Sequence, residues 1–275
     1  MSLFSIGILL LLGCFGGLMA GLLGVGGGMV LVPFLTSLFS TFHNLPQQYI
    51  VHISIATAMA TIMFTSLSSM RAHHLRGGVR WDIFIKFVPG ILIGGLLSGG
   101  VIFKMIDIGW LALVFAIFVS YSGFNMFRKK SEEVSTRALP PAYVIALVGV
   151  GIGLISGIVG AGGGFLTVPL LVWCSVPMRN AVGTSAACGF PIAVSNVIGY
   201  IYGGMSEIGV QNGLVGFVYW PALLALISMS VIFAPIGAKL AHSLPVNTLR
   251  KVFAVLLFFL ALLMLKRSLL EFGLI

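Results

Sequence analysis

Apolar residues run through this chain in long blocks that are separated by short polar connections. Blocks of about 20 apolar residues are long enough to cross a bilayer as helices. The second and seventh blocks are much shorter, and each follows a run of three glycines, which indicates a half-helix or a short, tilted span. The blocks cover roughly residues 4–23, 29–41, 50–70, 83–103, 108–127, 141–159, 165–176, 181–202, 213–238 and 250–270.

The chain carries one sequence pattern twice. Residues 21–35 read GLLGVGGGMVLVPFL, and residues 157–171 read GIVGAGGGFLTVPLL. In each copy a proline follows five residues after three consecutive glycines, and these prolines, Pro33 and Pro169, are 136 positions apart. Glycine and proline are poor helix formers, so each copy predicts a helix that is broken inside an apolar stretch. Breaks at corresponding positions in two halves indicate the binding site of a membrane transporter.

The polar segment 129–140 divides the chain into two halves of similar length. We expect a first repeat over residues 1–128, a cytoplasmic linker over 129–140 and a second repeat over 141–275. Each half holds about five helical segments, and this odd number makes the second half enter the membrane from the opposite side. The sequence thus predicts an all-α polytopic membrane protein. It would contain two inverted repeats, each with a broken or re-entrant helix hairpin at its glycine-rich motif.

Composition places the chain in a bilayer. It is 59% hydrophobic and 8% charged, with a mean hydropathy of +1.15, whereas soluble domains carry about 25% charged residues. Most basic residues fall in connections on one side of the expected spans, so the net charge of +9 reflects topology rather than nucleic-acid binding. The positive-inside rule makes that side cytoplasmic and both termini external, in a bacterial inner membrane. The start of the chain lacks the basic region of a signal peptide.

The glycine motifs are the first candidates for a substrate site. A helix that restarts after a break exposes main-chain N–H groups and the positive end of its dipole, and both attract an anion. The alternative interpretation is that the glycines only permit close crossing of helices. The predicted substrate-binding glycines are Gly24, Gly26, Gly27, Gly28, Gly160, Gly162, Gly163 and Gly164.

Hydroxyl and amide side chains are expected to complete this site. Thr57 and Thr184 occupy corresponding places in the two halves, and a serine follows each of them by eleven residues, or about three helical turns. Neutral donors suit a transported anion because binding must permit release. The alternative is that these hydroxyls bond carbonyls of their own helices. The expected set is Thr57, Ser68, Thr184, Ser185, Ser195 and Asn196.

Two ionisable residues are candidates for gating or proton coupling. His52 lies near the external start of an apolar block and could titrate during transport; the alternative is a hydrogen-bonding role at the interface. Arg179 precedes Thr184 and could attract an oxyanion at the pathway mouth; the alternative is a charge that sets topology. Cys14, Cys174 and Cys188 have no metal-ligand spacing, and we expect no metal and no cofactor.

The doubled glycine motif, together with Arg179, Gly183-Thr184-Ser185 and Ala234-Pro235-Ile236-Gly237-Ala238, resembles the TauE/SafE sulfite exporter family, which is also described with toluene-sulfonate uptake permeases. The resemblance covers about residues 6–270. It implies a permease for sulfite or an organosulfur anion such as a sulfonate, acting mainly in export, with the motif glycines as family positions.

The leading hypothesis is therefore a secondary transporter, an exporter that works by alternating access. Its partners would be a small anionic substrate, the lipid bilayer and protons as a coupling ion, without nucleic acid. An anion channel and a carrier for an unrelated small carboxylate are the alternatives. An intramembrane enzyme is not expected, because the serine in Gly153-Leu154-Ile155-Ser156-Gly157 has no histidine in the second half before His242.

Overall fold

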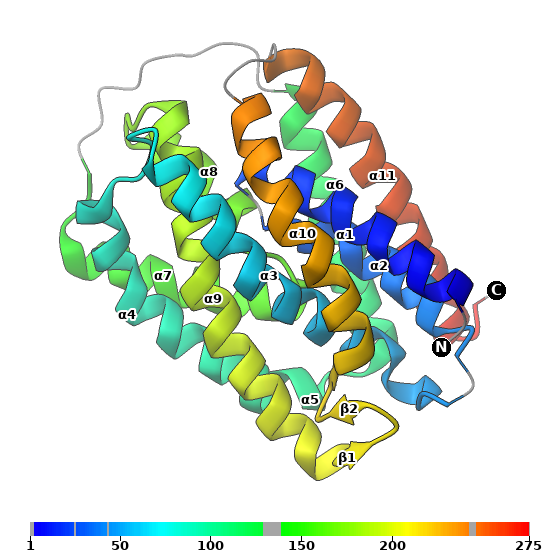
Figure 1. The fold of residues 1–275 in the computed structure, drawn as a ribbon. Coiled ribbons are helices and arrows are strands. Elements are labelled where there is room, and N and C mark those ends of the chain that lie inside the picture. Colours follow the sequence, from blue (N-terminus) through cyan, green and yellow to red (C-terminus); the bar gives the residue numbers. More distant parts are fainter. Residues whose placement is uncertain (1–2, 25, 43, 129–138, 242–245, 275) are drawn as a thin grey trace.

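A computed structural model describes residues 3–24, 26–42, 44–128, 139–241 and 246–274. The chain is almost entirely helical, as the apolar blocks predict (Figure 1). Most of the predicted linker and His242 lie outside the described residues. The helices are α1 (Leu3–Leu23), α2 (Gly28–Phe39), η1 (Gln47–Tyr49), α3 (Ile50–His74), α4 (Trp81–Leu97), η2 (Ser98–Ile102), α5 (Phe103–Met105), α6 (Ile108–Arg128), α7 (Ala142–Val159), α8 (Gly164–Trp173), α9 (Met178–Glu207), α10 (Trp220–Ala241) and α11 (Val246–Glu271).

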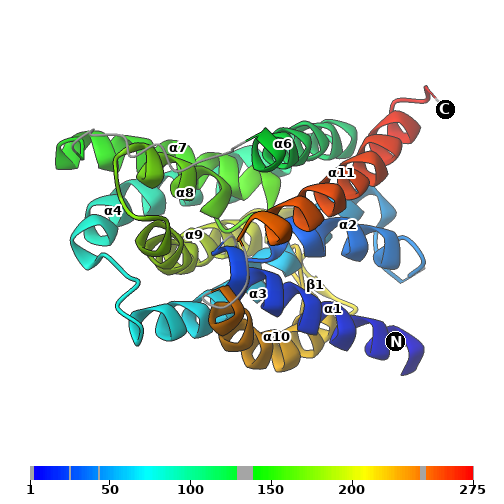
Figure 2. The same ribbon diagram turned by 90° about the horizontal axis from the view of Figure 1, so that it is seen from above.

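Helix length separates spanning helices from short ones. Within the described ranges, six helical stretches are long and apolar enough to cross a bilayer: Leu3–Leu22, Gln47–His74, Trp81–Met105, Ala142–Val159, Met178–Glu207 and Trp220–Ala241. Helices α2 and α8 contain 12 and 10 residues, and a helix of that length extends only about 15–18 Å. The expectation of an all-α polytopic membrane protein is confirmed. Each short helix folds back from the longer helix before it (Figures 1 and 2).

Helices α3 and α9 form the centre of the bundle. In each, 83% of the spanning window is buried, compared with 33–39% in the other four long spans. They pack on each other, with α4 and α7 on one side and α1, α2 and α10 on the other (Figure 2). Outer helices instead expose large apolar side chains such as Leu11, Leu147 and Leu224. Hydroxyl groups collect on α3 and α9 because polar groups inside a membrane must face protein rather than lipid.

The two halves of the chain are interlocked. Helix α1 packs mainly on α10, and α7 packs mainly on α4. Both contacts depend on glycines spaced by four residues, which allow two helix backbones to approach closely. Gly13, Gly17 and Gly21 of α1 face the α10 backbone at Leu226, Ser230 and Ala234; Gly149 and Gly153 of α7 face the α4 backbone at Phe87 and Ile91.

A small antiparallel sheet lies between α9 and α10. The sequence predicted one apolar span over 213–238, but strands β1 (Val210–Gln211), β2 (Leu214–Val215) and β3 (Val218–Tyr219) precede α10, so the predicted start of this span was wrong. Asn212 and Gly213 both have positive φ, 49° and 82°, at the turn between β1 and β2. An Asn-Gly pair is a hairpin signal, so the sequence did contain a sign of the sheet.

Candidate functional site

Both glycine motifs break the helix, as predicted. Helix α1 ends at Leu23 and α7 at Val159, and the following glycines, Gly24 and Gly160, have φ of 65° and 69°. Gly27 and Gly163, which directly precede α2 and α8, have φ of 75° and 74°. Residues with side chains rarely adopt these left-handed conformations, so glycine is required at all four positions. The same two conformational switches therefore occur 136 positions apart.

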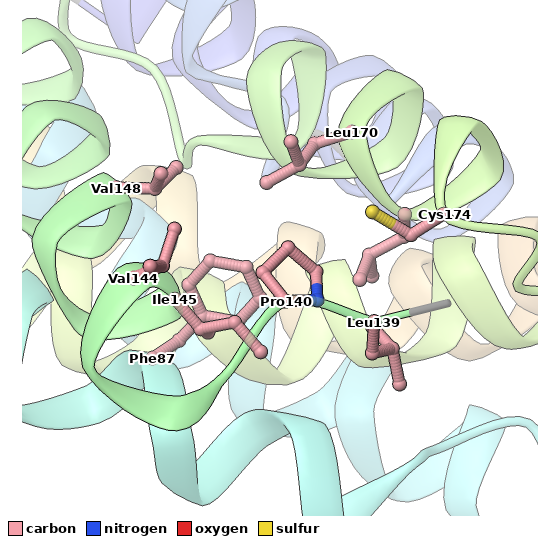
Figure 3. A pocket seen from close by; sticks show the side chains of 9 residues that line it. Phe87, Leu139, Pro140, Val144, Ile145, Val148, Leu170 and Cys174 are labelled. Carbon is pink, nitrogen blue, oxygen red and sulfur yellow. The ribbon is translucent and has the colours of Figure 1, made fainter. Parts of the chain in front are cut away.

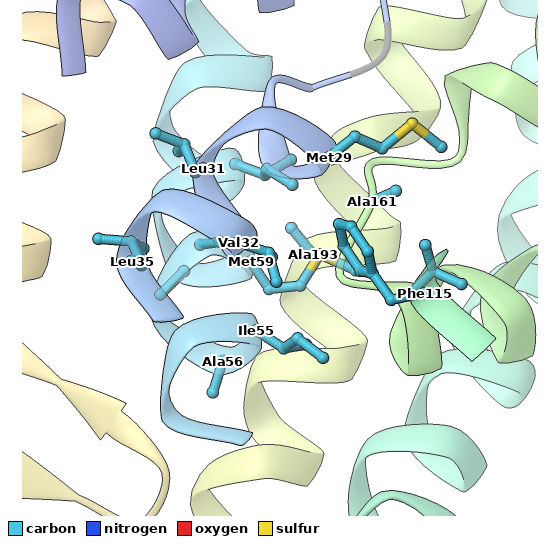
Figure 4. Packing of buried hydrophobic residues seen from close by; sticks show 14 of the residues in the cluster. Met29, Leu31, Val32, Leu35, Ile55, Ala56, Met59, Phe115, Ala161 and Ala193 are labelled. Atoms are coloured by element: carbon cyan, nitrogen blue, oxygen red, sulfur yellow. The ribbon is translucent and has the colours of Figure 1, made fainter. Parts of the chain in front are cut away.

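The two broken segments touch each other. A Cβ atom built on Gly26 would lie 3.1 Å from Gly162 Cα, and one on Gly28 would collide with the Gly160 carbonyl. The contact lies in the apolar core, where Met29 and Val32 of α2 and Ala161 of the second motif are surrounded by side chains of α3, α6 and α9 (Figure 4). Close approach of backbones, in addition to φ, therefore requires glycine here.

Each short helix begins with main-chain donors that its own carbonyls do not use. The first bonds of α2 run from the N–H groups of Val30 and Leu31 to the Gly27 carbonyl. In α8 the corresponding donors are Leu166 and Thr167, which bond the Gly163 carbonyl. The amides of the first two residues in each helix consequently have no intrahelical acceptor. These donors and the helix dipoles supply partial positive charge at the centre of the protein.

A small pocket adjoins the first motif. We call it the motif-1 pocket, and Ala20, Gly24, Gly26, Ser66, Ser69, Ala186 and Gly189 line it. Ser66 Oγ donates to the Met63 carbonyl at 3.2 Å, whereas Ser69 Oγ is buried and has no hydrogen-bond partner among the described residues. The pocket has no room for a water-sized sphere in this structure, so an anion could enter it only if the surrounding helices moved apart.

A second pocket has different chemistry. It lies between α4, α7 and α8, and its lining is apolar except for one thiol (Figure 3). The lining residues are Phe87, Leu139, Pro140, Val144, Ile145, Val148, Leu170, Leu171 and Cys174. Because it offers neither a hydroxyl nor a charged group, this pocket is not a candidate for an anion site.

The two predicted threonines bond main-chain groups next to the first residues of two other long helices. Thr57 Oγ1 accepts a hydrogen bond from the N–H of Tyr219 (3.1 Å), and Thr184 Oγ1 accepts one from the N–H of Arg80 (2.9 Å). Tyr219 and Arg80 each directly precede a long helix, α10 and α4. The threonines thus match in the two halves, as the sequence indicated, but each connects a central helix to the start of another helix.

The other predicted side chains are dispersed. Ser68 Oγ donates to the Val231 carbonyl of α10 (2.8 Å), and Ser195 Oγ donates to carbonyls of its own helix. Ser185 Oγ donates to the Gly24 carbonyl (3.0 Å) and so contacts the first motif directly. Asn196 Nδ2 donates to the Ile192 carbonyl (2.8 Å), and its Oδ1 faces the position of Gly157. Of these four side chains, Ser185 is the one bonded to a motif carbonyl.

The two ionisable candidates lie at opposite ends of the bundle. His52 is buried in an aromatic cluster, and its Nε2 is 3.1 Å from the Phe103 carbonyl and 3.0 Å from the Ile106 carbonyl. These contacts attach α3 to α5 and to the residue that directly follows α5. Arg179 is the second residue of α9, close to Gly78 on the connection between α3 and α4. Neither position tests the predicted roles in gating or proton coupling.

The predicted set omits Ser66 and Ser69, which line the motif-1 pocket. It contains Ser68 because of its eleven-residue spacing to Thr57, but Ser68 points to α10. Ser66 and Ser69 are three residues apart and share a helix face. A second missed pair is His73, whose Nε2 is 3.2 Å from the Gly21 carbonyl, and Tyr200, whose hydroxyl donates to the Gly157 carbonyl. Because the residue types differ, comparison of the two half-sequences could not reveal this match.

The sequence matches a known protein family over most of its length. A family model described as sulfite exporter TauE/SafE matches residues 9–264. The chain belongs to the TauE/SafE family. The resemblance expected from the motifs is confirmed, and the TauE/SafE chain is a membrane transporter.

Several relatives of this TauE/SafE chain carry the name "probable membrane transporter protein". One from Haemophilus influenzae is 32% identical over 254 residues, which cover 92% of this chain and 95% of the relative. One from Methanocaldococcus jannaschii is 26% identical, with 88% and 89% covered. YunE of Bacillus subtilis is 28% identical, with 91% and 93% covered. No solved structure matches the chain significantly.

Proposed function

We propose that this protein is a secondary transporter that exports a small anion, with sulfite or an organosulfur anion such as a sulfonate as substrate. The observation that carries the proposal is the contact between the two broken segments, Gly26 against Gly162, inside the apolar core. Each segment opens a short helix with unused amide donors, and such paired helix starts favour an anion without placing a full charge in the membrane.

The buried polar groups support weak binding of an anion. Those in the described part of the chain are hydroxyls, one amide and two imidazoles, without a carboxylate, an ammonium or a guanidinium. Neutral donors stabilise an anion less than a buried cation does, and this suits a substrate that must be released. A buried carboxylate for cation coupling is likewise absent from that set, which leaves protons on a histidine such as His52 as the coupling route we propose.

Alternating access between two inverted repeats, 1–128 and 141–275, would move the substrate. Matched contacts support this part of the proposal: Thr57 with Thr184, His73 with Tyr200, and the glycine spacing of α1 with that of α7. With the basic connections in the cytoplasm, both termini are external and the protein resides in the bacterial inner membrane. An anion channel is the second candidate, but the motif-1 pocket is too small to hold a water-sized sphere and so forms no open pore in this structure, which favours a carrier. A carrier for a small carboxylate differs only in the substrate.

Transport by purified protein in liposomes tests the proposal. We expect saturable uptake of radiolabelled sulfite or a sulfonate, with counterflow, and no large unitary conductance in planar bilayers. A panel of sulfite, sulfate, thiosulfate, sulfoacetate, taurine and dicarboxylates separates sulfur anions from carboxylates. Exclusive transport of a dicarboxylate would contradict the proposed substrate, and high conductance would contradict a carrier.

The variant Gly26→Ala tests the glycine contact itself. Gly26 has a φ of 80°, and its new methyl would press on Ile62 and Gly162, so we expect uptake to be lost. Gly77→Ala is the matched control, since Gly77 has a φ of 67° but no atom within 4 Å of the new methyl. Wild-type uptake by Gly26→Ala, or equal loss in both variants, would remove the glycine contact as the basis of the site.

A further inference from the structure

We propose that the transported anion occupies one side of the glycine contact, the motif-1 pocket, where Ser69 donates to it and Gly189 sets the space available. This inference rests on the proposed function. It differs from a site shared equally by the two motifs, which the similarity of the half-sequences would suggest.

Helices α3 and α9 differ in residue size at the positions that line the motif-1 pocket. Residues of α3 and α9 correspond at an offset of 127, the distance from Thr57 to Thr184. Ala186 and Gly189, which line the motif-1 pocket, therefore correspond to Met59 and Ile62. Both of these large side chains are fully buried. Ala186 and Gly189 are thus small where α3 carries a methionine and an isoleucine, and Ile62 itself packs against Gly26 and Gly28 of the first motif.

Ser69 differs from the other hydroxyls of its helix. Ser54, Thr61 and Thr65 each donate to the carbonyl four residues earlier, at 2.7, 2.9 and 2.5 Å. This bond is the usual way for a helical hydroxyl to be satisfied in an apolar environment. Ser69 Oγ is buried, lines the pocket and has no partner among the described residues. A buried donor without a partner needs an explanation, and an anion in the pocket would accept its hydrogen bond.

The polar atoms beside the second motif do not offer the same opportunity. Ser156 Oγ also has no described partner, but it lies beside Gly163, where the Ile192 side chain fills the space. Asn196, which corresponds to Ser69, already uses Nδ2 for the Ile192 carbonyl. Its unpartnered Oδ1 is an acceptor and repels an anion. Within the part of the chain that the structure describes, small lining residues and an unpartnered hydroxyl donor therefore coincide at the motif-1 pocket, whereas Ile192 occupies the place beside Ser156.

The decisive experiment measures sulfite binding to purified protein by calorimetry, together with thermal unfolding. Ser69→Ala should weaken binding by about 10- to 100-fold, because a hydrogen bond to a charged group is lost. The same change removes a buried unpartnered hydroxyl, so the unfolding temperature should stay constant or rise. Ser156→Ala should leave the affinity unchanged. A merely structural serine would lower the unfolding temperature without changing the affinity.

A second pair of variants tests the space rather than the donor. A methyl on Gly189 would lie 3.2 Å from Ser66 Cβ and so narrow the pocket. Gly203 is the matched control on the same helix, because its new methyl would lie 3.1 Å from the Gly100 carbonyl, at the contact with η2. We expect Gly189→Ala to weaken sulfite binding about tenfold, the effect of about 1.4 kcal/mol, and Gly203→Ala to leave it unchanged.

The outcomes separate this inference from the proposed function. Equal loss of affinity in Ser69→Ala and Ser156→Ala would establish a shared site and overturn the one-sided pocket, while the transporter proposal stands. Wild-type affinity in both Ser69→Ala and Gly189→Ala would also overturn it. If the wild-type protein binds no anion of the panel, the proposed function fails and this inference fails with it.

Discussion

Individual residues in this protein act through backbone conformation and through single hydrogen bonds. Gly24, Gly27, Gly160 and Gly163 adopt positive φ and so allow the helix to stop and restart. Most buried hydroxyls bond a carbonyl or a main-chain N–H, and Ser69 is an exception beside the motif-1 pocket. Removal of a structural hydroxyl should therefore lower the stability of the protein, whereas removal of a ligand-binding hydroxyl should lower its affinity for the anion.

Thr57→Val and Thr184→Val are expected to lower stability without changing affinity. Each substitution keeps the shape of the side chain but leaves a main-chain N–H, of Tyr219 or Arg80, without its acceptor. The cost should be about 1–3 kcal/mol, visible as a lower unfolding temperature in detergent. Thr36→Val is the control, because Thr36 Oγ1 only donates to the Val32 carbonyl of its own helix. Tenfold weaker sulfite binding by Thr57→Val, at normal stability, would assign this hydroxyl to the site instead.

At the scale of helices, close packing of glycine faces connects the two halves. Helix α1 meets α10 and α7 meets α4 through glycines at intervals of four residues. The partner atoms are backbone carbonyls and amides, which cannot move aside as a flexible side chain can. The positions of the short helices α2 and α8 depend on the α1–α10 and α7–α4 contacts, because the breaks that precede α2 and α8 directly follow α1 and α7.

Alanine substitutions on α1 test this packing. Gly17→Ala would press a methyl onto the Ser230 backbone, and overpacking of this kind costs about 1–3 kcal/mol. Gly7→Ala on the same helix meets nothing within 4 Å and gains up to about 1 kcal/mol of helix propensity. Thermal unfolding should therefore show a lower transition for Gly17→Ala and an equal or higher one for Gly7→Ala. An equal effect of the two substitutions would mean that α1 and α10 are not closely packed in the membrane.

Alanine substitutions at two glycines of α7 should change the unfolding temperature in the same way as those on α1. Gly153→Ala would approach the Ile91 carbonyl at 2.6 Å, whereas Gly151→Ala meets nothing within 4 Å. We expect a lower unfolding temperature for Gly153→Ala and no decrease for Gly151→Ala. Destabilisation by Gly17→Ala but not by Gly153→Ala would show that the two halves pack differently, and would weaken the proposal of inverted repeats.

Across the whole molecule, the connections divide into two groups. The connection between α3 and α4, the start of α7 and the turn between α8 and α9 lie along the upper and left edge, while the sheet and both termini lie at the lower right (Figure 1). At the lower right, Tyr49 donates to Glu207 Oε2 at 3.0 Å and Asn212 Nδ2 donates to the Asn44 carbonyl at 3.2 Å. On the other side, Asn180 Nδ2 donates to the Gly77 carbonyl at 3.2 Å.

Labelling with a membrane-impermeant maleimide tests the orientation of the molecule. In a variant without Cys14, Cys174 and Cys188, a cysteine replaces either Val210 or Leu75, which are 69% and 74% exposed. We expect Val210→Cys to react in intact cells and Leu75→Cys to react only after permeabilisation, because the positive-inside rule predicts that the basic connection containing Leu75 lies in the cytoplasm. The opposite pattern would invert the proposed topology.

Local signals predicted most of the fold. Except for the block 213–238, whose helix starts only at Trp220, the apolar blocks match the described helices to within about five residues, because the length and apolarity that a bilayer requires are properties of one segment. The breaks at Gly24 and Gly160 were predicted because glycine acts on the local backbone, whereas Pro33 and Pro169 lie inside α2 and α8 and do not interrupt them. The sheet before α10 was missed, although Asn212-Gly213 marks its first turn, because the strands are only two residues long and merge with an apolar block.

The sequence alone determined that this chain crosses a membrane, that two helices break at matching glycines, and that it resembles the TauE/SafE family. Only the tertiary structure decided that Gly26 meets Gly162, that Ser69 rather than Ser68 lines a pocket, and that Ile62 packs against the first motif. Hydropathy and backbone preferences act within one segment. Which hydroxyl faces a pocket depends on the rotation of its helix, and that rotation is set by side chains more than a hundred residues away.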